Sequence, residues 1–379
     1  MRLNNNQIVF FELLRAGLWE KECRLTKYTP VDFAEVLRIA EEQAVVGLIA
    51  AGLEHVTDIR FSKYDALPFL GQALQLEQRN SAMNSFIGEL VDKMKDANIY
   101  TLLVKGQGVA QSYERPLWRA SGDIDLLLNE DNYEKAKAFL TPLASNVERE
   151  RKAAKHLGMT IDSWPVELHG KLRCGLSNKI NRELYSIQKD VFENRRAEVW
   201  DNGGSEVPLL GVENHVIYVF IHFLNHFYKG GVGLRQICDW IRLMWSNRNS
   251  LNVLEIKQHI RAMGLVTEWN AFGALAVDYL GLDVMAVPLF DDQFNGYNRK
   301  MIKKKAERII AFVMAVGNFG HKRDLSYYGK YAFLVRKIVS FGQRCGDLIR
   351  HARIFPIDSL RFFPHILFNG LRSALIKEG

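Results

Sequence analysis

The stretch that decides the fold runs from residue 102 to residue 128 and reads LLVKGQGVAQSYERPLWRASGDIDLLL. Each end is a short apolar run of the kind found in buried strands. Asp123 and Asp125 stand two residues apart in the second run. Because side chains alternate along a strand, both carboxylates are expected on one face. The pattern therefore predicts a sheet that presents a pair of acids.

This acid pair favours a metal site. Two like charges at close range repel, and a cation between them removes the repulsion. Carboxylate oxygens suit Mg²⁺, which proteins bind through one or two carboxylates together with substrate phosphates. The alternative is a solvated edge strand whose aspartates bind no metal, or an aspartate at a strand end that caps the next helix.

Two neighbouring segments strengthen the metal interpretation. Lys105 and Gly106 follow an expected strand and begin a short helix, where backbone amides and the helix N-terminus can bind an anion. Glu167 lies on a later expected strand and offers a third carboxylate. Together these segments predict a phosphate cradle beside three acids.

The chain divides into three regions by pattern. Residues 1–98 have helical periodicity, residues 99–210 alternate short apolar runs with turns, and residues 211–379 are helical again. We therefore predict an α+β fold in which a small mixed β-sheet is flanked by N-terminal and C-terminal helical regions.

Individual elements of this fold can also be predicted. The first region should contain a long helix over about residues 65–97. In the middle region, Asp131 and Glu134 resemble a capping box that starts a helix. Strands are expected there at residues 99–104, 124–128, 146–152, 157–162 and 165–172, with a short helix at 106–113.

Composition excludes several classes of protein. The 379 residues are 48% hydrophobic and 25% charged, which excludes disordered and collagen-like chains. The four cysteines form no CxxC pair, which argues against a zinc knuckle or a disulfide framework. Glu12 and Arg15 interrupt the N-terminal apolar run, and no segment approaches about 18 uncharged apolar residues. We therefore expect a cytoplasmic protein without a spanning helix.

The net charge of +7 is concentrated near the C-terminus, where residues 299–379 hold 17 Lys and Arg against 5 Asp and Glu. Basic and apolar residues alternate there, and the basic ones include Lys303, Lys304, Lys305, Arg336, Lys337, Arg350, Arg353 and Arg361. Basic amphipathic helices can contact an anionic membrane surface, an acidic partner or nucleic acid. A helical subdomain with a solvated basic face is the favoured alternative. Because this charge lies far from the acid pair in sequence, nucleic acid is not the expected partner.

In combination, these motifs resemble a known family. Over about residues 30–245 the sequence is similar to the uncharacterised nucleotidyltransferases, a group within the polymerase-beta-type nucleotidyltransferase superfamily. The motifs that carry the resemblance are, in order, Lys105-Gly106, RASGDIDLL from residue 119, VELHG from residue 166 and HFLNHFYKGGVGLRQICDWIRLM from residue 222. One departure is that Gln107 follows Gly106, where the superfamily usually has a second glycine or a serine.

The resemblance implies a reaction. It implies Mg²⁺-dependent transfer of NMP, most simply AMP, from a nucleoside triphosphate to a hydroxyl of a small-molecule, sugar or protein acceptor. Asp123, Asp125 and Glu167 would be the catalytic residues and would hold two Mg²⁺ ions, with Mn²⁺ as the alternative. Glu167 would also help to deprotonate the attacking hydroxyl.

The resemblance also implies nucleotide contacts. Lys105 and the Gly106 amide would bind the β- and γ-phosphates, and Ser121 would belong to the same nucleotide-binding set. Arg119 would reach a phosphate or the acceptor. For Arg119, the alternative is an ordinary surface arginine.

Further residues are expected on a wall of the cleft facing the sheet, namely His169, His222, His226, Lys229, Arg235 and Asp239. His169 shares a strand face with Glu167 and would position Glu167 or the acceptor. Packed, hydrogen-bonded histidines are the alternative for this set. A zinc protease is disfavoured, because the His222–His226 pair lacks the intervening glutamate of HExxH.

Two other functions stay open at this stage. The first is a catalytically inactive nucleotide-binding or scaffold module with a nucleotidyltransferase fold. The second, weaker one is a transferase that modifies RNA or DNA, whose affinity should fall steeply with salt. An active enzyme is favoured, because closely spaced carboxylates that bind nothing would only lower stability.

Overall fold

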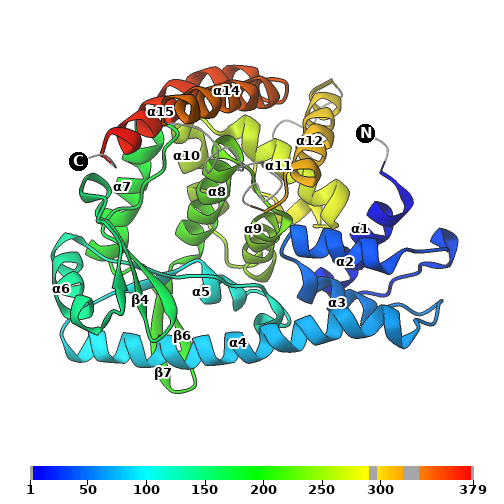
Figure 1. The fold of residues 1–379 in the computed structure, drawn as a ribbon, viewed down its shortest axis with the longest axis horizontal. Helices are drawn as coiled ribbons and strands as arrows, with labels where there is room; N and C mark the ends of the chain where they lie inside the picture. The colour runs from blue at the N-terminus through cyan, green and yellow to red at the C-terminus, as the bar shows by residue number, and fades with distance from the viewer. Residues whose placement is uncertain (1–2, 290–296, 319–332, 377–379) are drawn as a thin grey trace.

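A computed structural model describes residues 3–289, 297–318 and 333–376 (Figure 1). Its centre is a seven-stranded mixed sheet with the strand order β3-β4-β5-β2-β1-β7-β6. The strands are β1 (Leu102–Val104), β2 (Ile124–Leu127), β3 (Asn146–Val147), β4 (His156–Ile161), β5 (Trp164–His169), β6 (Ala197–Asn202) and β7 (Ser205–Leu210). The predicted α+β class is confirmed.

Helices surround the sheet on both sides (Figure 1). The N-terminal ones are α1 (Asn5–Trp19), α2 (Phe33–Glu42), α3 (Val46–Glu54) and α4 (Lys63–Asp96). Three helices lie between strands, α5 (Gly106–Ala110), α6 (Glu130–Leu140) and α7 (Asn178–Glu193). The C-terminal ones are α8 (Val212–Lys229), α9 (Leu234–Ser246), α10 (Val253–Met263), α11 (Val266–Leu280), α12 (Tyr297–Val316), α14 (Phe333–Ala352) and α15 (Pro356–Ile376).

The two faces of the sheet have different partners. Leu103, Leu126 and Val166 belong to one face, which packs against Met83 and Ile87 of the long helix α4 in a separate buried cluster. Residues one position along each strand point to the other face because side chains alternate. That second face carries Asp125 and Glu167 and lies toward α8. The alternation therefore places the acids on the side of the sheet away from α4.

The larger buried cluster joins distant parts of the chain. It contains residues from α1, such as Phe10, together with Trp240 of α9 and Phe355 near the C-terminal end. The N-terminal and C-terminal helical regions thus share one core, which stabilises the helices that face the site. The division of the chain after residues 98 and 210 stays a prediction.

Several elements differ from the sequence expectations. The helix expected to start at Asp131 begins at Glu130, because Asn129 is the N-cap and its side chain accepts a hydrogen bond from the amide of Asn132. The strand expected at 146–152 is limited to Asn146–Val147, which is exposed. Helix α7 and the β6–β7 hairpin were not predicted.

The missed hairpin has a two-residue turn. Gly203 and Gly204 join β6 to β7, with φ angles of 63° and 100°. Such turns need positive φ at both central residues, which glycine adopts without steric cost. The hairpin extends the sheet beyond β1, since β7 pairs in parallel with β1.

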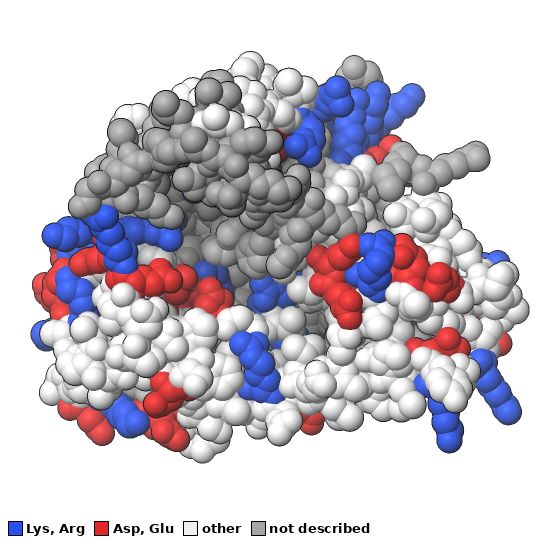
Figure 2. Space-filling model, in the orientation of Figure 1, with Lys and Arg blue, Asp and Glu red and all other residues white. Residues whose placement is uncertain are grey.

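The basic C-terminal region is partly packed against the body. Both Nη atoms of Arg361 donate to backbone carbonyls, those of Met263 and Gly264, at 2.8 and 3.2 Å. The exposed end of α12, which includes Lys303 and Lys304, forms a basic surface (Figure 2). The side chains of Arg336 and Lys337 lie outside the described residues. A contact of this region with an anionic surface stays a prediction.

Among the described residues, no helix has the length and apolarity that crossing a membrane requires.

Candidate active site

Pairing between β2 and β5 brings the predicted acids together. Asp125 lies opposite Glu167 in the parallel β2–β5 ladder, and Asp123 immediately precedes β2 on the same face. One carboxylate oxygen from each of the three residues lies within 4.8 Å of the others. The arrangement can hold a divalent metal ion through oxygen ligands. The sequence pattern alone had predicted this cluster.

The three carboxylates differ in their electrostatic surroundings. The charge of Asp125 and burial raise the pKa of Asp123. Burial also acts to raise the pKa of Asp125, but Lys105 and His169 outweigh it and lower that pKa. Hydrogen bonds with His156 and His169 lower the pKa of Glu167. Asp123 is thus the acid that remains destabilised by its neighbours, and a cation would remove that destabilisation.

Lys105 lies directly beside the acids. Its ammonium nitrogen is 2.8 Å from Oδ1 of Asp125. Burial alone would lower the pKa of Lys105, but the charge of Asp125 reverses this and raises it, so the side chain is protonated. The backbone of Lys105 has φ 65° and ψ −156°, a conformation found almost only in glycine. This unusual backbone turns the chain from β1 into α5 and directs the side chain to the acids.

His169 contacts two of the three acids. Its Nε2 lies 2.7 Å from Oδ1 of Asp125 and 3.4 Å from Oε2 of Glu167. Burial opposes the charged imidazole, but the hydrogen bonds with the two carboxylates raise its pKa. The structure therefore places His169 on the strand face that carries Glu167, as its spacing predicts.

Arg119 is buried, so the alternative of a surface arginine is wrong. Its Nε and Nη2 donate to the two carboxylate oxygens of Asp239 in α9, at 2.7 and 2.6 Å. Its Nη1 donates to Oγ of Ser121 at 2.7 Å. Tyr113 also donates its hydroxyl to Asp239 at 2.8 Å. Arg119 therefore connects the segment before the acids to the helical wall.

Two further arginines hold that same segment through its backbone. Arg235 of α9 donates from Nη1 to the carbonyl of Ala120 at 2.7 Å. Arg79 of α4 donates to the carbonyls of Ser121 and Gly122. The segment that leads into Asp123 is therefore fixed from both sides. The role of Arg79 was not predicted, since nothing in the pattern of α4 distinguishes it.

Helix α8 supplies two neutral histidines. Nε2 of His226 lies 3.1 Å from Nε2 of His222. Burial lowers the pKa of His226 to about 4 and that of His222 well below its usual value. Among the described residues, the groups of three or more close metal donors include neither histidine. The pair is therefore suited to hydrogen bonding rather than to a zinc site.

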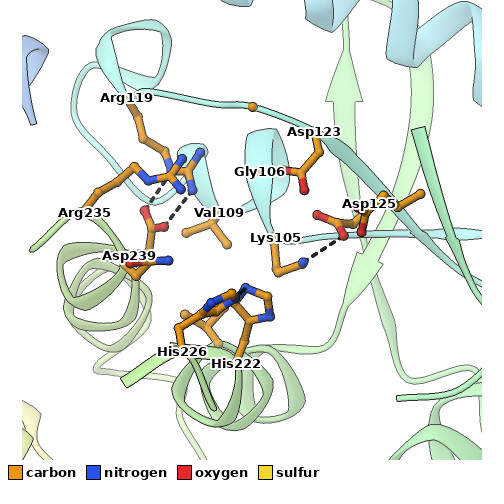
Figure 3. A pocket seen from close by; sticks show the side chains of 14 residues that line it. Lys105, Gly106, Val109, Arg119, Asp123, Asp125, His222, His226, Arg235 and Asp239 are labelled. Carbon is orange, nitrogen blue, oxygen red and sulfur yellow. Dashed lines mark hydrogen bonds and ion pairs between the residues drawn. The ribbon is translucent and has the colours of Figure 1, made fainter. Parts of the chain in front are cut away.

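These side chains enclose a pocket of about 190 Å³ (Figure 3). Acids line one side of it, Arg119 and Arg235 line the opposite side, and the two histidines of α8 form a third wall. The lining residues are Lys105, Gly106, Val109, Arg119, Gly122, Asp123, Asp125, Glu167, Val219, His222, His226, Arg235, Gln236 and Asp239.

The pocket therefore gathers most of the predicted site residues, but three lie outside its lining. Ser121 and His169 act behind it, as partners of Arg119 and Asp125. Lys229 lies at the end of α8 against Gly175, where a Cβ on that glycine would overlap its side chain. The structure does not bring Lys229 to the acids.

His156 is another residue that sequence reasoning missed. It begins β4 and lies opposite His169 in the β4–β5 hairpin. Its Nε2 is 3.1 Å from Oε2 of Glu167. The signal that could have located it is the antiparallel register, because the hairpin turn at 162–163 fixes which residue of β4 faces His169.

Comparison with known proteins identifies the family of this chain. The sequence profile described as "Uncharacterised nucleotidyltransferase" matches residues 29–281. Searches among curated proteins and among solved structures give no match. The profile covers the acids, Lys105, Arg119 and the histidines of α8. The chain belongs to the uncharacterised nucleotidyltransferase family.

Proposed function

We propose that the protein is a Mg²⁺-dependent nucleotidyltransferase that moves NMP, most simply AMP, from a nucleoside triphosphate to a hydroxyl of an acceptor. The observation that carries the proposal is the group of three carboxylates whose oxygens lie within 4.8 Å of one another, in a pocket whose opposite side is basic. Family membership indicates nucleotidyl transfer in general terms. The identity of the ion, of the transferred nucleotide and of the hydroxyl acceptor goes beyond family membership and is our proposal.

The residues fit a divalent cation. Asp123, Asp125 and Glu167 offer only oxygen ligands, the donor type that Mg²⁺ prefers. The raised pKa of Asp123 shows that its neighbours disfavour its charge in the absence of a cation. When bound, Mg²⁺ supplies positive charge that neutralises phosphate oxygens during phosphoryl chemistry. Mn²⁺ is the alternative ion for the same ligands.

Lys105 is proposed to bind the phosphates. Its side chain lines the pocket and carries a charge that burial does not remove. The ion pair with Asp125 keeps the ammonium at the boundary between the acids and the pocket. A charged donor in a buried site stabilises negative charge more strongly than it would in water.

Arg119, Ser121 and Asp239 are proposed to position the site. The Arg119 guanidinium is engaged by Asp239 through two hydrogen bonds. Its main contribution is therefore to hold the segment before Asp123, with a phosphate contact as the lesser part. Ser121 contributes through Arg119, to which it is hydrogen-bonded.

Glu167 is proposed as a metal ligand above all. Its lowered pKa makes it a weak base, so it is better suited to holding a cation than to taking a proton from the acceptor. His222 and His226 are neutral and line the pocket. Because the Nε2 of one ring donates to the Nε2 of the other, at most one ring of the pair has an acceptor nitrogen left for a hydroxyl.

The volume of the pocket limits how much of the substrate it can enclose. Pockets for whole small-molecule ligands usually measure about 300–1,000 Å³. At about 190 Å³, this one is smaller. We therefore propose that it encloses the triphosphate, with the nucleoside and the acceptor reaching toward the outside.

A transfer assay tests the proposal. Triphosphates labelled at the α-phosphorus are incubated with Mg²⁺ and with sugars, polyols or the protein itself, and both pyrophosphate and labelled product are measured. Wild type should release pyrophosphate, and Asp125→Asn should not. Asp131→Asn, an exposed aspartate on α6, is the matched control and should behave as wild type. Nucleotide binding without turnover for any acceptor would instead support an inactive nucleotide-binding module.

A further inference from the structure

A second group of metal donors lies beside the acids. Nε2 of His156, Oε2 of Glu167 and Nε2 of His169 all lie within 4.8 Å of one another. Glu167 Oε2 is 3.1 Å from the His156 nitrogen and 3.4 Å from the His169 nitrogen. Adjacent ligands of a four-coordinate zinc ion, bound at about 2.0–2.2 Å, are about 3.3–3.6 Å apart. Two of the three donor–donor distances are therefore already close to the spacing that such an ion needs.

The β4–β5 hairpin fixes this arrangement. His156 lies directly opposite His169 in the antiparallel ladder, and Glu167 lies two residues from His169 on the same strand. Because side chains alternate along β5, Glu167 and His169 share one face. The ligands therefore stand on paired strands rather than on a loop, which favours a well-defined site.

The donor types differ from those of the acid group. Two imidazole nitrogens and one carboxylate are the ligand set of many zinc sites, and imidazole suits transition metals rather than Mg²⁺. The side chains of His156, Glu167 and His169 are 15%, 32% and 13% exposed. They are thus shielded but reachable from solvent, as a site that loads from solution must be.

We propose that His156, Glu167 and His169 bind one transition-metal ion of the Zn²⁺ class at a second site next to the acid group, where Nε2 of His169 would exchange its hydrogen bond to Asp125 for the ion. This site does not depend on the proposed transferase activity, because its ligands and its test involve no nucleotide. It shares Glu167 with the acid group, however. An ion at the histidines would therefore engage the carboxylate that the acid pair also needs, and Zn²⁺ should oppose Mg²⁺-dependent activity.

Cobalt spectroscopy tests the proposal. Untagged protein is titrated with Co²⁺, whose visible absorption is strong in four-coordinate sites with nitrogen ligands and weak in six-coordinate oxygen sites. We expect a band that saturates at one ion per chain in wild type and that Zn²⁺ abolishes. His156→Gln should weaken the binding that produces this band by at least about 10-fold.

One histidine variant serves as a matched control. His259 has a carboxylate partner at a similar distance, since its Nδ1 lies 3.2 Å from Glu183, but it lies outside the metal-donor groups of the described residues. His259→Gln should therefore keep the band. Circular dichroism establishes that each variant is folded.

A measurement on wild type tests the site even if His156→Gln does not fold. X-ray absorption of wild type loaded with one equivalent of Zn²⁺ should show two imidazole nitrogens among the ligands. The proposal is overturned if only oxygen ligands are seen, if wild type gives no band, or if folded His156→Gln binds Co²⁺ as tightly as wild type.

Discussion

The ammonium nitrogen of Lys105 lies 2.8 Å from Oδ1 of Asp125, and a backbone conformation typical of glycine places it there. A lysine in this conformation costs of order 1–3 kcal/mol of stability. The cost is tolerated where the surrounding structure fixes the residue, as the ion pair with buried Asp125 does. The backbone conformation of Lys105 thus lowers the stability of the protein but places the ammonium group beside Asp125.

Two substitutions of Lys105 distinguish the effect of its backbone conformation on stability from the effect of its charge. Both Lys105→Gly and Lys105→Ala remove the ammonium and leave Asp125 without it, but only glycine relieves the backbone. We expect the glycine variant to be more stable than the alanine variant by about 1–2 kcal/mol, as measured by urea denaturation. Both should lose affinity for nucleotide. Equal stability of the two variants would show that the φ of Lys105 carries no strain.

The buried pair of Arg119 and Asp239 should be important for stability. Asp239→Asn leaves the guanidinium without its charged partner in a buried site, so we expect a loss of about 3–5 kcal/mol. Arg119→Lys cannot form both hydrogen bonds and should also destabilise the protein. The measurement is urea denaturation at constant pH. Arg24→Gln, which breaks an exposed pair with Glu22, is the control and should leave the midpoint unchanged.

Stability should fall in acid because of His215. Burial lowers the pKa of this histidine to about 4, whereas its pKa in the unfolded chain is about 6.5. Between these values only the unfolded chain takes up the proton, so the contribution of His215 is complete above pH 6.5 and decreases as the pH falls toward 4. The shift corresponds to about 3 kcal/mol.

His215→Gln isolates this contribution. The free energy of unfolding is measured for both proteins between pH 7 and pH 4.5, and the loss on acidification should be smaller in the variant. All other groups are common to the two proteins, so the difference in slope belongs to His215. Parallel curves would mean that this histidine titrates alike in the folded and unfolded chains.

Close packing of α1 on α3 requires glycine at residue 17. A Cβ at Gly17 would overlap the carbonyl oxygen of Leu48 in α3. Gly17→Ala should therefore cost about 1–3 kcal/mol through overpacking. Gly71 of α4 has open space around it, so Gly71→Ala should stabilise the protein by up to about 1 kcal/mol. Urea denaturation of the two variants should give shifts of opposite sign, and shifts of the same sign would contradict the described packing.

The parts of the fold that were predictable are those with a local signal. The apolar runs of β1 and β2 and the alternation around Asp123 and Asp125 gave the sheet and the acid pair. The β6–β7 hairpin was missed although Gly203-Gly204 is a turn signal, because the exposed strand β6 lacks a clear apolar alternation.

The contacts of the site that were missed join residues far apart in the sequence. Arg119 and Asp239 are 120 residues apart, and no periodicity reveals that one is the partner of the other. His156 faces His169 only because a two-residue turn with positive φ at Asp162 and Ser163 sets the register. These residues are not the usual Asn-Gly of such turns, so the pattern gave no signal.

Calorimetric titration tests most directly whether the acid pair binds a metal–nucleotide complex. ATP, GTP, CTP and UTP are titrated into wild type and into the double variant Asp123→Asn/Asp125→Asn, with and without Mg²⁺. We predict that at least one triphosphate binds wild type only when Mg²⁺ is present, and that the double variant loses this binding. If no triphosphate binds wild type under any metal condition, or if the double variant binds as well as wild type, the proposed function is contradicted.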